Sequence, residues 1–242
     1  MFFALASQGR FRRAVLSDRN QELIDVYRAL KRNAQAVVRL LRDYPYDREF
    51  YYQLRAINPK TLELEPRAAR TIYLNRTGFN GLYRVNRSGQ FNVPFGRHVN
   101  PTICDERRLL DAAELLKRTK LRTADFEVAC AECQPGDAVY FDPPYVPLSR
   151  TSSFTAYHHE AFGEEEHERL ATLFGRLRER QVHAVLSNSD TPRTQELYQP
   201  WQVEKLLVAR PINSKTTQRG NVGEILVCNL ARRKRKASAA VR

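Results

Sequence analysis

Apolar residues recur at helical spacing in several long segments of the chain. Between residues 21 and 43 the apolar positions fall three or four residues apart, which is typical of a helix with one face in a core. The same spacing predicts helices over residues 47–57, 105–118 and 164–181. A further helix is expected to open at Glu65, because the proline that follows is tolerated in a first helical turn.

Short apolar runs bounded by turn residues alternate with these helices. The runs predict strands over residues 14–18, 121–125, 138–141, 183–187, 205–209 and 224–230. Strands that alternate with helices are typical of a largely parallel sheet covered by helices. The sequence therefore predicts an α/β fold of Rossmann-like type, with a helical segment inserted between the first two strands.

The run Ala138–Phe141 stops abruptly on Asp142-Pro143-Pro144-Tyr145. Four apolar residues in a row predict a buried central strand, and the two prolines end it because neither can donate a hydrogen bond to a ladder. Ligands of open α/β sheets bind at the carboxyl ends of the strands, so these four residues are expected at the working edge.

The charge of the chain is strongly basic and unevenly distributed. It carries 40 Lys and Arg against 27 Asp and Glu, for a net charge of +13. The 39 residues from Pro66 to Cys104 contain no acidic residue, and arginines, aromatics and amides are interleaved there. These are the groups that contact phosphates and base edges, which favours a nucleic-acid partner over a purely structural hairpin.

Other classes of function find little support in the composition. No run of 18 apolar residues exists, and no basic start precedes the short apolar segment at the N-terminus, so a cytoplasmic protein with no membrane span is expected. Cys130 and Cys133 form one C-x-x-C pair without two further ligands at paired spacing. We therefore expect reduced thiols and no metal site.

The residues after the third predicted strand suit chemistry on an aminated base. The lone pair of such an amine is delocalised into the ring, and acceptors aimed at its hydrogens make it a better nucleophile. The Asp142 carboxylate and the Pro143 carbonyl can both accept from the amine, Pro144 helps to keep the loop rigid, and Tyr145 offers a stacking face.

Several segments together resemble the Dam-type DNA adenine N6-methyltransferases. They are DPPY at 142–145, YLNRTGFNGLYRVNRSGQFNVPFGR at 73–97, AVLSDRNQELI at 14–24, FTAY at 154–157 and VLSNSD at 185–190. The resemblance implies S-adenosylmethionine as cofactor and double-stranded DNA as partner. It also implies that residues 146–162 form a loop around the extruded adenine.

The resemblance assigns cofactor contacts to the ends of the first two predicted strands and to Asp142. Asp18 matches the acid that accepts from the ribose hydroxyls, although it could instead form a helix capping box with Gln21. Asp125 and Phe126 match residues beside the adenine of the cofactor, and an N-cap with a core Phe is the alternative. The ten glycines include no G-x-G, so no cofactor-cradling loop can be assigned, either because the true start lies upstream or because the copy is degenerate.

The resemblance also assigns DNA contacts within the basic stretch. Arg84 matches a residue that makes a bidentate contact to a guanine, for which the guanidinium fork is suited. Leu82 and Pro94 match contacts to thymine methyl groups, and Phe79 with Asn80 matches a wedge at the gap left by the adenine. A phosphate contact and a structural role are both open for Arg97, and the implied target is GATC or a close relative.

These inferences divide the chain into three parts. Residues 1–21 and 108–230 are expected to form the methyltransferase core, residues 22–107 the target recognition domain, and residues 231–242 a disordered basic tail. The expected reaction is methylation of adenine N6 in duplex DNA, in repair, regulation or restriction-modification. The alternatives are a DNA-binding homologue without catalysis and a methyltransferase acting on RNA or on cytosine N4.

Overall fold

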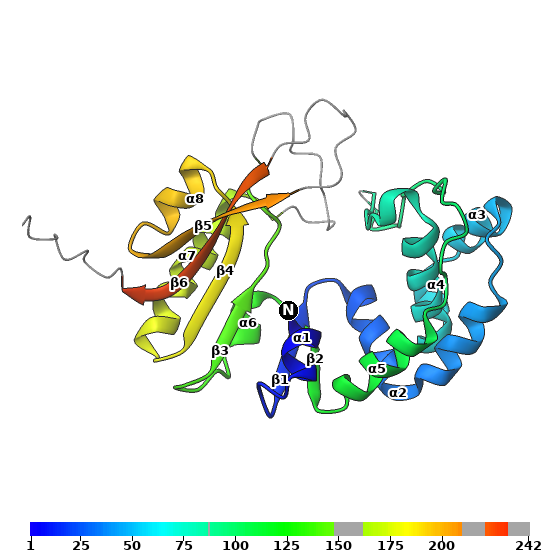
Figure 1. Ribbon diagram of the computed structural model, residues 1–242, viewed down its shortest axis with the longest axis horizontal. Helices are drawn as coiled ribbons and strands as arrows, with labels where there is room; N and C mark the ends of the chain where they lie inside the picture. The colour runs from blue at the N-terminus through cyan, green and yellow to red at the C-terminus, as the bar shows by residue number, and fades with distance from the viewer. Residues whose placement is uncertain (87, 148–161, 210–220, 232–242) are drawn as a thin grey trace, which may run out of the picture. The chain divides into compact units, whose positions relative to one another are not determined.

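The computed structural model describes residues 1–86, 88–147, 162–209 and 221–231 (Figure 1). The chain folds as two compact units, the first comprising residues 1–129 and the second the described residues from 130 onward. The predicted division into a methyltransferase core and a recognition insert stays a prediction.

Helices dominate the first unit. The long helix α2 (Gln21–Asp43) packs against both α4 (Leu64–Thr77) and α5 (Glu106–Leu116), as Figure 1 shows. Helix α3 (Arg48–Ala56) and the short 3-10 helix η1 (Pro59–Thr61) connect α2 to α4. The four predicted helices in this region are thus confirmed, and the apolar stripes that predicted them form one core. Its largest fully buried apolar side chains include Ile24, Leu41, Tyr51, Tyr73, Leu74 and Leu116.

Helix α2 is interrupted at one residue. Asn33 has φ −157° and ψ 75°, which lie outside the helical region, and its Oδ1 accepts a hydrogen bond from Ala36 N at 3.1 Å. Asn33 therefore acts as an N-cap for the second half of the helix. The apolar spacing predicted one continuous helix, because spacing alone cannot reveal a side chain that caps the backbone in the middle of a helix.

A parallel pair of strands completes the first unit. Strand β1 (Ala14–Asp18) has the predicted bounds, whereas β2 (Thr119–Thr123) begins and ends two residues earlier than predicted. The strand begins with the polar residues Thr119 and Lys120, so the apolar pattern did not include its first two positions. Asp18 is in register with Thr123, so both strands end at the same edge. Helix α1 (Phe2–Ser7) precedes β1.

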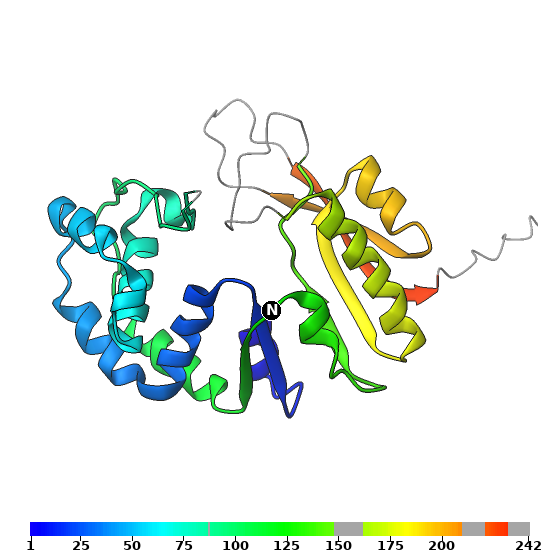
Figure 2. The same cartoon turned by 180° about the vertical axis from the view of Figure 1, so that it is seen from behind.

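The second unit contains a four-stranded sheet in the order β3-β4-β6-β5. Strand β3 (Ala138–Phe141) is parallel to β4 (His183–Ser189), and β6 (Asn221–Ala231) runs antiparallel to both β4 and β5 (Trp201–Ala209). Helix α7 (Glu164–Glu179) packs on β4 and β6, and Figure 2 shows it lying across one face of the sheet. Two shorter helices are α6 (Phe126–Cys130), where the two units join, and α8 (Pro192–Leu197).

The structure corrects one prediction about β3. The strand ends at Phe141, before the two prolines, as predicted, but it is an edge strand of the four-stranded sheet and is not buried throughout. Only Phe141 is buried, while Ala138 and Tyr140 are exposed. An apolar run predicts that Tyr140 is in the core. In the structure its hydroxyl instead makes a polar contact with Ser187 on β4.

Candidate active site and DNA interface

The residues predicted to polarise the target amine form the corner after β3 in the second unit. Phe141 anchors the end of the strand in the core, where its ring contacts Phe174 with centroids 6.2 Å apart. Asp142 is exposed, and Tyr145 is half-buried after the two prolines. A carboxylate and an aromatic ring are thus brought together beyond the strand, as the proposed chemistry requires.

A buried serine on the neighbouring strand holds this corner. Ser187 Oγ lies 3.0 Å from Asp142 Oδ1 and 2.8 Å from the Tyr140 hydroxyl. The Tyr145 hydroxyl lies 3.5 Å from Glu224 Oε2 on β6. Burial raises the pKa of Tyr145, and a hydrogen bond with Ser187 offsets part of that rise. Tyr145 therefore stays neutral at physiological pH.

The next residue on β4 holds the other end of the corner. Asn188 is fully buried, and its Oδ1 accepts a hydrogen bond from Val146 N at 2.9 Å. Its Nδ2 has no hydrogen-bond partner in the part of the chain that the structure describes. Ser187 and Asn188, which are consecutive in β4, thus hold the Asp142 carboxylate at the start of the corner and the Val146 backbone at its end.

In the first unit, the end of β1 places Asp18 beside the start of α2. Asp18 Oδ1 accepts from Asn20 N at 2.7 Å, and Asn20 Oδ1 in turn accepts from Glu22 N and Leu23 N. The cap of the helix is therefore Asn20, and the capping box considered for Asp18 with Gln21 is not formed. An Asn side chain can accept from the first free amides by itself, so the helix needs no capping box with Asp18.

Asp125 lies close to Asp18 because the two strands that precede them are paired. Ala124 N donates to Asp18 O at 3.1 Å, directly before Asp125. Asp125 Oδ1 accepts from Glu127 N at 2.9 Å at the start of α6, so its N-capping role is present in the structure. Phe126 is half-buried. The capping bond does not test whether Asp125 and Phe126 contact the cofactor, so that assignment stays a prediction.

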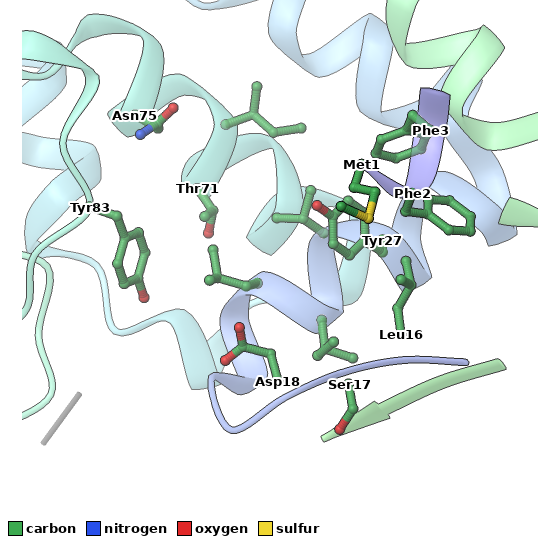
Figure 3. Close-up of a pocket in the computed structure, with 14 residues that line it drawn as sticks. Met1, Phe2, Phe3, Leu16, Ser17, Asp18, Tyr27, Thr71, Asn75 and Tyr83 are labelled. Carbon is green, nitrogen blue, oxygen red and sulfur yellow. The ribbon is translucent and has the colours of Figure 1, made fainter. Parts of the chain in front are cut away.

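A cavity of about 460 Å³ opens next to Asp18 (Figure 3). Its volume falls in the range of ordinary small-molecule sites, which is about 300–1,000 Å³. Phe2, Leu16 and Tyr27 contribute apolar walls, while Asp18 and Tyr83 supply polar groups. An acidic acceptor beside apolar walls fits a nucleoside, whose ribose offers two hydroxyl donors and whose base offers a flat face. The residues present therefore fit the adenosine part of S-adenosylmethionine.

All six residues predicted to contact DNA are exposed in the structure. Phe79 is 48% exposed and Leu82 is 41% exposed, which is unusual for large apolar side chains. They belong to one segment that begins at the short 3-10 helix η2 (Phe79–Gly81) and runs antiparallel to itself, with bridges pairing Gly78 with Phe95 and Val85 with Phe91. The remaining exposed members are Asn80, Arg84, Pro94 and Arg97.

Buried residues hold this exposed segment in place. Phe79 N donates to Pro94 O at 2.9 Å, so the predicted wedge and one predicted thymine contact are fixed side by side. Gly78 packs so closely on α4 that an added Cβ would lie 2.5 Å from Leu74 O. Asn80 adopts a left-handed conformation with φ 52°, which Asn tolerates better than most residues.

Two arginines of the basic stretch have a different role. Arg70 is only 2% exposed, and it donates to Leu54 O and Arg55 O at 3.0 Å each. Arg67 Nη1 pairs with Asp25 Oδ2 at 2.7 Å. These side chains stabilise the packing of α4 against α2 and α3, so the positive charge available to a phosphate comes from the exposed arginines further along the segment.

Comparison with known proteins agrees with this geometry. The profile of the family described as D12 class N6 adenine-specific DNA methyltransferase matches residues 1–210. The chain belongs to this family. The methyltransferase is 43% identical over 238 residues to the Type II methyltransferase M1.LlaDCHI of Lactococcus lactis subsp. cremoris, covering 95% of this chain and 82% of that protein. It is 37% identical over 220 residues to the DNA adenine methylase of Escherichia coli, covering 89% and 79%.

Family membership confirms the main inferences from the sequence. The resemblance to Dam-type enzymes, the methyltransferase fold class and the activity of a DNA adenine-N6 methyltransferase are all shown. The family acts on DNA, and methyl transfer implies S-adenosylmethionine as donor. The roles of individual residues stay predictions.

The sequence did not single out several residues that the structure places around the candidate site residues. Ser187, Tyr140 and Glu224 surround the corner, and Asn92 holds Arg84. A polar Ser-Asn-Ser-Asp run at the end of an apolar strand was the one available signal for Ser187. Most of the loop predicted around the adenine, residues 148–161, and the basic tail, residues 232–242, lie outside the described residues.

Two further features of the described residues bear on other functions of the methyltransferase. None of its helices in the described ranges has the length and apolar character needed to cross a membrane. The same ranges contain no group of three or more His, Cys, Asp or Glu side chains arranged to hold a metal ion. Neither Cys130 nor Cys133 is in a disulfide bond.

Proposed function

We propose that this methyltransferase transfers a methyl group from S-adenosylmethionine to N6 of adenine in double-stranded DNA, at GATC or a close relative. The family supplies the reaction class, and the target sequence rests on the match of residues 73–97 to the recognition segment of Dam-type enzymes. Because DNA is its substrate, we expect the protein to act in the cytoplasm beside the nucleoid.

The chemistry at the amine falls to the corner after β3. The Asp142 carboxylate and the Pro143 carbonyl accept the two N6 hydrogens and keep the nitrogen lone pair available for attack. Pro144 stiffens the turn, and the half-buried ring of Tyr145 stacks on the extruded adenine. When bound, S-adenosylmethionine supplies the electrophilic methyl carbon, and the C–S electron pair leaves with the sulfur. The methylated nitrogen, now strongly acidic, loses its proton to water.

Asp18 is the residue that we propose to hold the ribose of the cofactor. Its carboxylate lines the 460 Å³ cavity and keeps its place through the hydrogen bond from Asn20 N. Asp125 and Phe126, at the end of the paired strand, would bind the adenine through its amino group and its ring face. The close pairing of β1 and β2 supports this assignment.

The exposed segment of the first unit would read the DNA. Arg84 would contact a guanine, Leu82 and Pro94 the thymine methyl groups, and Phe79 with Asn80 the gap left by the flipped adenine. Arg97 would contact a phosphate. The exposure of all six side chains supports their availability to a ligand.

The single observation that carries the proposal is the exposed Asp142 carboxylate beside a half-buried Tyr145 at the end of β3. The test is transfer of a radiolabelled methyl group to duplex oligonucleotides with one GATC site and to duplexes with one altered base pair in it. We expect transfer to the GATC duplex and a large drop for each altered duplex. Equal transfer to all duplexes would refute the target assignment, and tight DNA binding without saturable cofactor binding would favour a non-catalytic homologue.

A further inference from the structure

The corner after β3 depends on one hydroxyl group from β4. Ser187 is 7% exposed, and its Oγ contacts the side chains of Asp142 and Tyr140 at 3.0 Å and 2.8 Å. Ser187 therefore contacts the carboxylate to which the proposed function gives a role at the amine, although it is 45 positions away from Asp142 in sequence.

The direction of these hydrogen bonds follows from the atoms involved. An ionised carboxylate can only accept, so the single hydrogen of Ser187 points to Asp142 Oδ1. The Tyr140 hydroxyl must then donate to Ser187 Oγ. The result is a directed chain from Tyr140 through Ser187 to Asp142, in which each donor orients the next.

This chain determines which oxygen of Asp142 is left for the substrate. Within the described ranges Ser187 is the one hydrogen-bond partner of the Asp142 side chain. With Oδ1 occupied, Oδ2 is the atom that accepts from the amine. A carboxylate on an exposed corner would otherwise rotate freely about its last torsion, so the bond to a buried hydroxyl reduces the number of orientations that it samples.

We propose that Ser187 is the positioning residue of the methyl transfer, which fixes the Asp142 carboxylate so that Oδ2 meets the N6 amine. This inference rests on the proposed function of the corner and extends it to a residue outside the Asp-Pro-Pro-Tyr motif. Asn188 supports the same arrangement by holding Val146 N at the exit of the corner.

Steady-state kinetics of the full chain with Ser187→Ala tests the proposal. We expect kcat to fall about 10- to 100-fold, since small misplacements of a reacting group cost rates of that order. The KM for duplex DNA should change little, because the exposed recognition segment is untouched. Ser187→Thr retains the hydroxyl and should restore most of kcat, a rescue that a merely structural role of the side-chain volume would not produce.

Two further variants separate positioning from packing and from failure of the proposed function. Ser189→Ala removes a buried hydroxyl two residues further along β4 that has no side-chain hydrogen bond among the described residues, and it should leave kcat unchanged. Tyr140→Phe breaks the outer link of the chain and should lower kcat less than Ser187→Ala. An unchanged kcat in Ser187→Ala, with active wild-type enzyme, would overturn the inference.

A structural readout does not depend on turnover. In crystals of Ser187→Ala, the Asp142 carboxylate should occupy more than one orientation, whereas in crystals of the wild type and of Ser187→Thr it should occupy one. A single unchanged orientation in Ser187→Ala would contradict the proposal even if the enzyme were inactive. An inactive wild type with an ordered carboxylate would count against the proposed function alone.

Discussion

Asn92 holds the guanidinium of Arg84 through two hydrogen bonds. Arg84 donates from Nε to Asn92 Oδ1 at 2.7 Å and from Nη2 to Asn92 O at 3.1 Å, while Asn92 N donates to Arg84 O at 3.0 Å. Arg84 is exposed, so these bonds orient a flexible side chain that would otherwise sample many rotamers in water. The long side chain proposed to read a guanine is thus ordered before DNA arrives.

We predict that Arg84→Ala removes about 1–3 kcal/mol of discrimination at one base pair of the target. Asn92→Ala should lose part of the same discrimination, because the guanidinium is still present but no longer oriented. Competition binding with duplexes altered at each position measures both effects. Arg97→Ala is the comparison, since loss of a phosphate contact should weaken all duplexes alike. Uniform weakening by Arg84→Ala would contradict base reading by Arg84.

Asp18→Asn tests the proposed ribose contact with little disturbance of the fold. The amide oxygen of Asn can still accept from Asn20 N, the bond that fixes this turn. It lacks the charge that strengthens a hydrogen bond from a hydroxyl, so we expect affinity for S-adenosylmethionine to fall about 10-fold or more. Calorimetric titration measures this affinity, and Asp111→Asn on the exposed face of α5 is the matched control. Equal affinities for both variants would exclude Asp18 from the site.

The space around Gly78 and Gly175 predicts opposite effects for their substitution by Ala. Gly78→Ala places a Cβ 2.5 Å from Leu74 O and 3.1 Å from the Tyr51 hydroxyl, so it should destabilise the fold by about 1–3 kcal/mol. Gly175→Ala, within α7, meets no atom closer than 3.7 Å and should stabilise it by about 0.5–1 kcal/mol. Urea unfolding of both variants measures the free energies. A stable Gly78→Ala protein would show that the segment does not pack on α4 as described.

Tyr83 predicts a loss of stability at high pH. Burial raises the pKa of Tyr83 to about 12 from an ordinary value of 10.0. The folded state therefore favours the protonated phenol, and this contribution is complete below pH 10 and is lost as the pH rises from about 10 to about 12. In unfolding free energies measured between pH 8 and 11, the wild type should lose stability relative to Tyr83→Phe as the pH rises. Parallel curves would show that the pKa of Tyr83 is not raised in the folded protein.

Local pattern was enough to predict the five longer helices and the six strands, because each depends on its own residues, but it did not predict the short helices α1, α6 and α8. The helix over Gln21–Asp43 and the strand over Ala14–Asp18 have the predicted bounds, and the prolines stopped β3 where expected. The exposure of Tyr140 could not be predicted, since it depends on a partner 47 positions away on β4. Ser187 and Asn92 were missed for the same reason, because their roles come from side chains that meet only in the folded chain.

The sequence motifs carried more information about function than the pattern of apolar and polar positions did. The Asp-Pro-Pro-Tyr sequence and the segment over residues 73–97 predicted the family that the comparisons confirm. The structure adds that every residue singled out for DNA contact is exposed, and that buried neighbours such as Gly78 and Val93 support them. Composition alone could not separate Arg70, which is buried against backbone carbonyls, from Arg84, which faces solvent.

The most direct test of the central claim is the identity of the nucleoside that the protein methylates. Unmethylated duplex DNA treated with the wild type and isotopically labelled S-adenosylmethionine is digested to nucleosides and analysed by mass spectrometry, with Asp142→Ala and Glu165→Ala in parallel. We predict labelled N6-methyladenine with the wild type and with Glu165→Ala, which alters an exposed carboxylate of α7, and none with Asp142→Ala although it still binds DNA. N4-methylcytosine as the product, or undiminished N6-methyladenine from Asp142→Ala, would contradict the account.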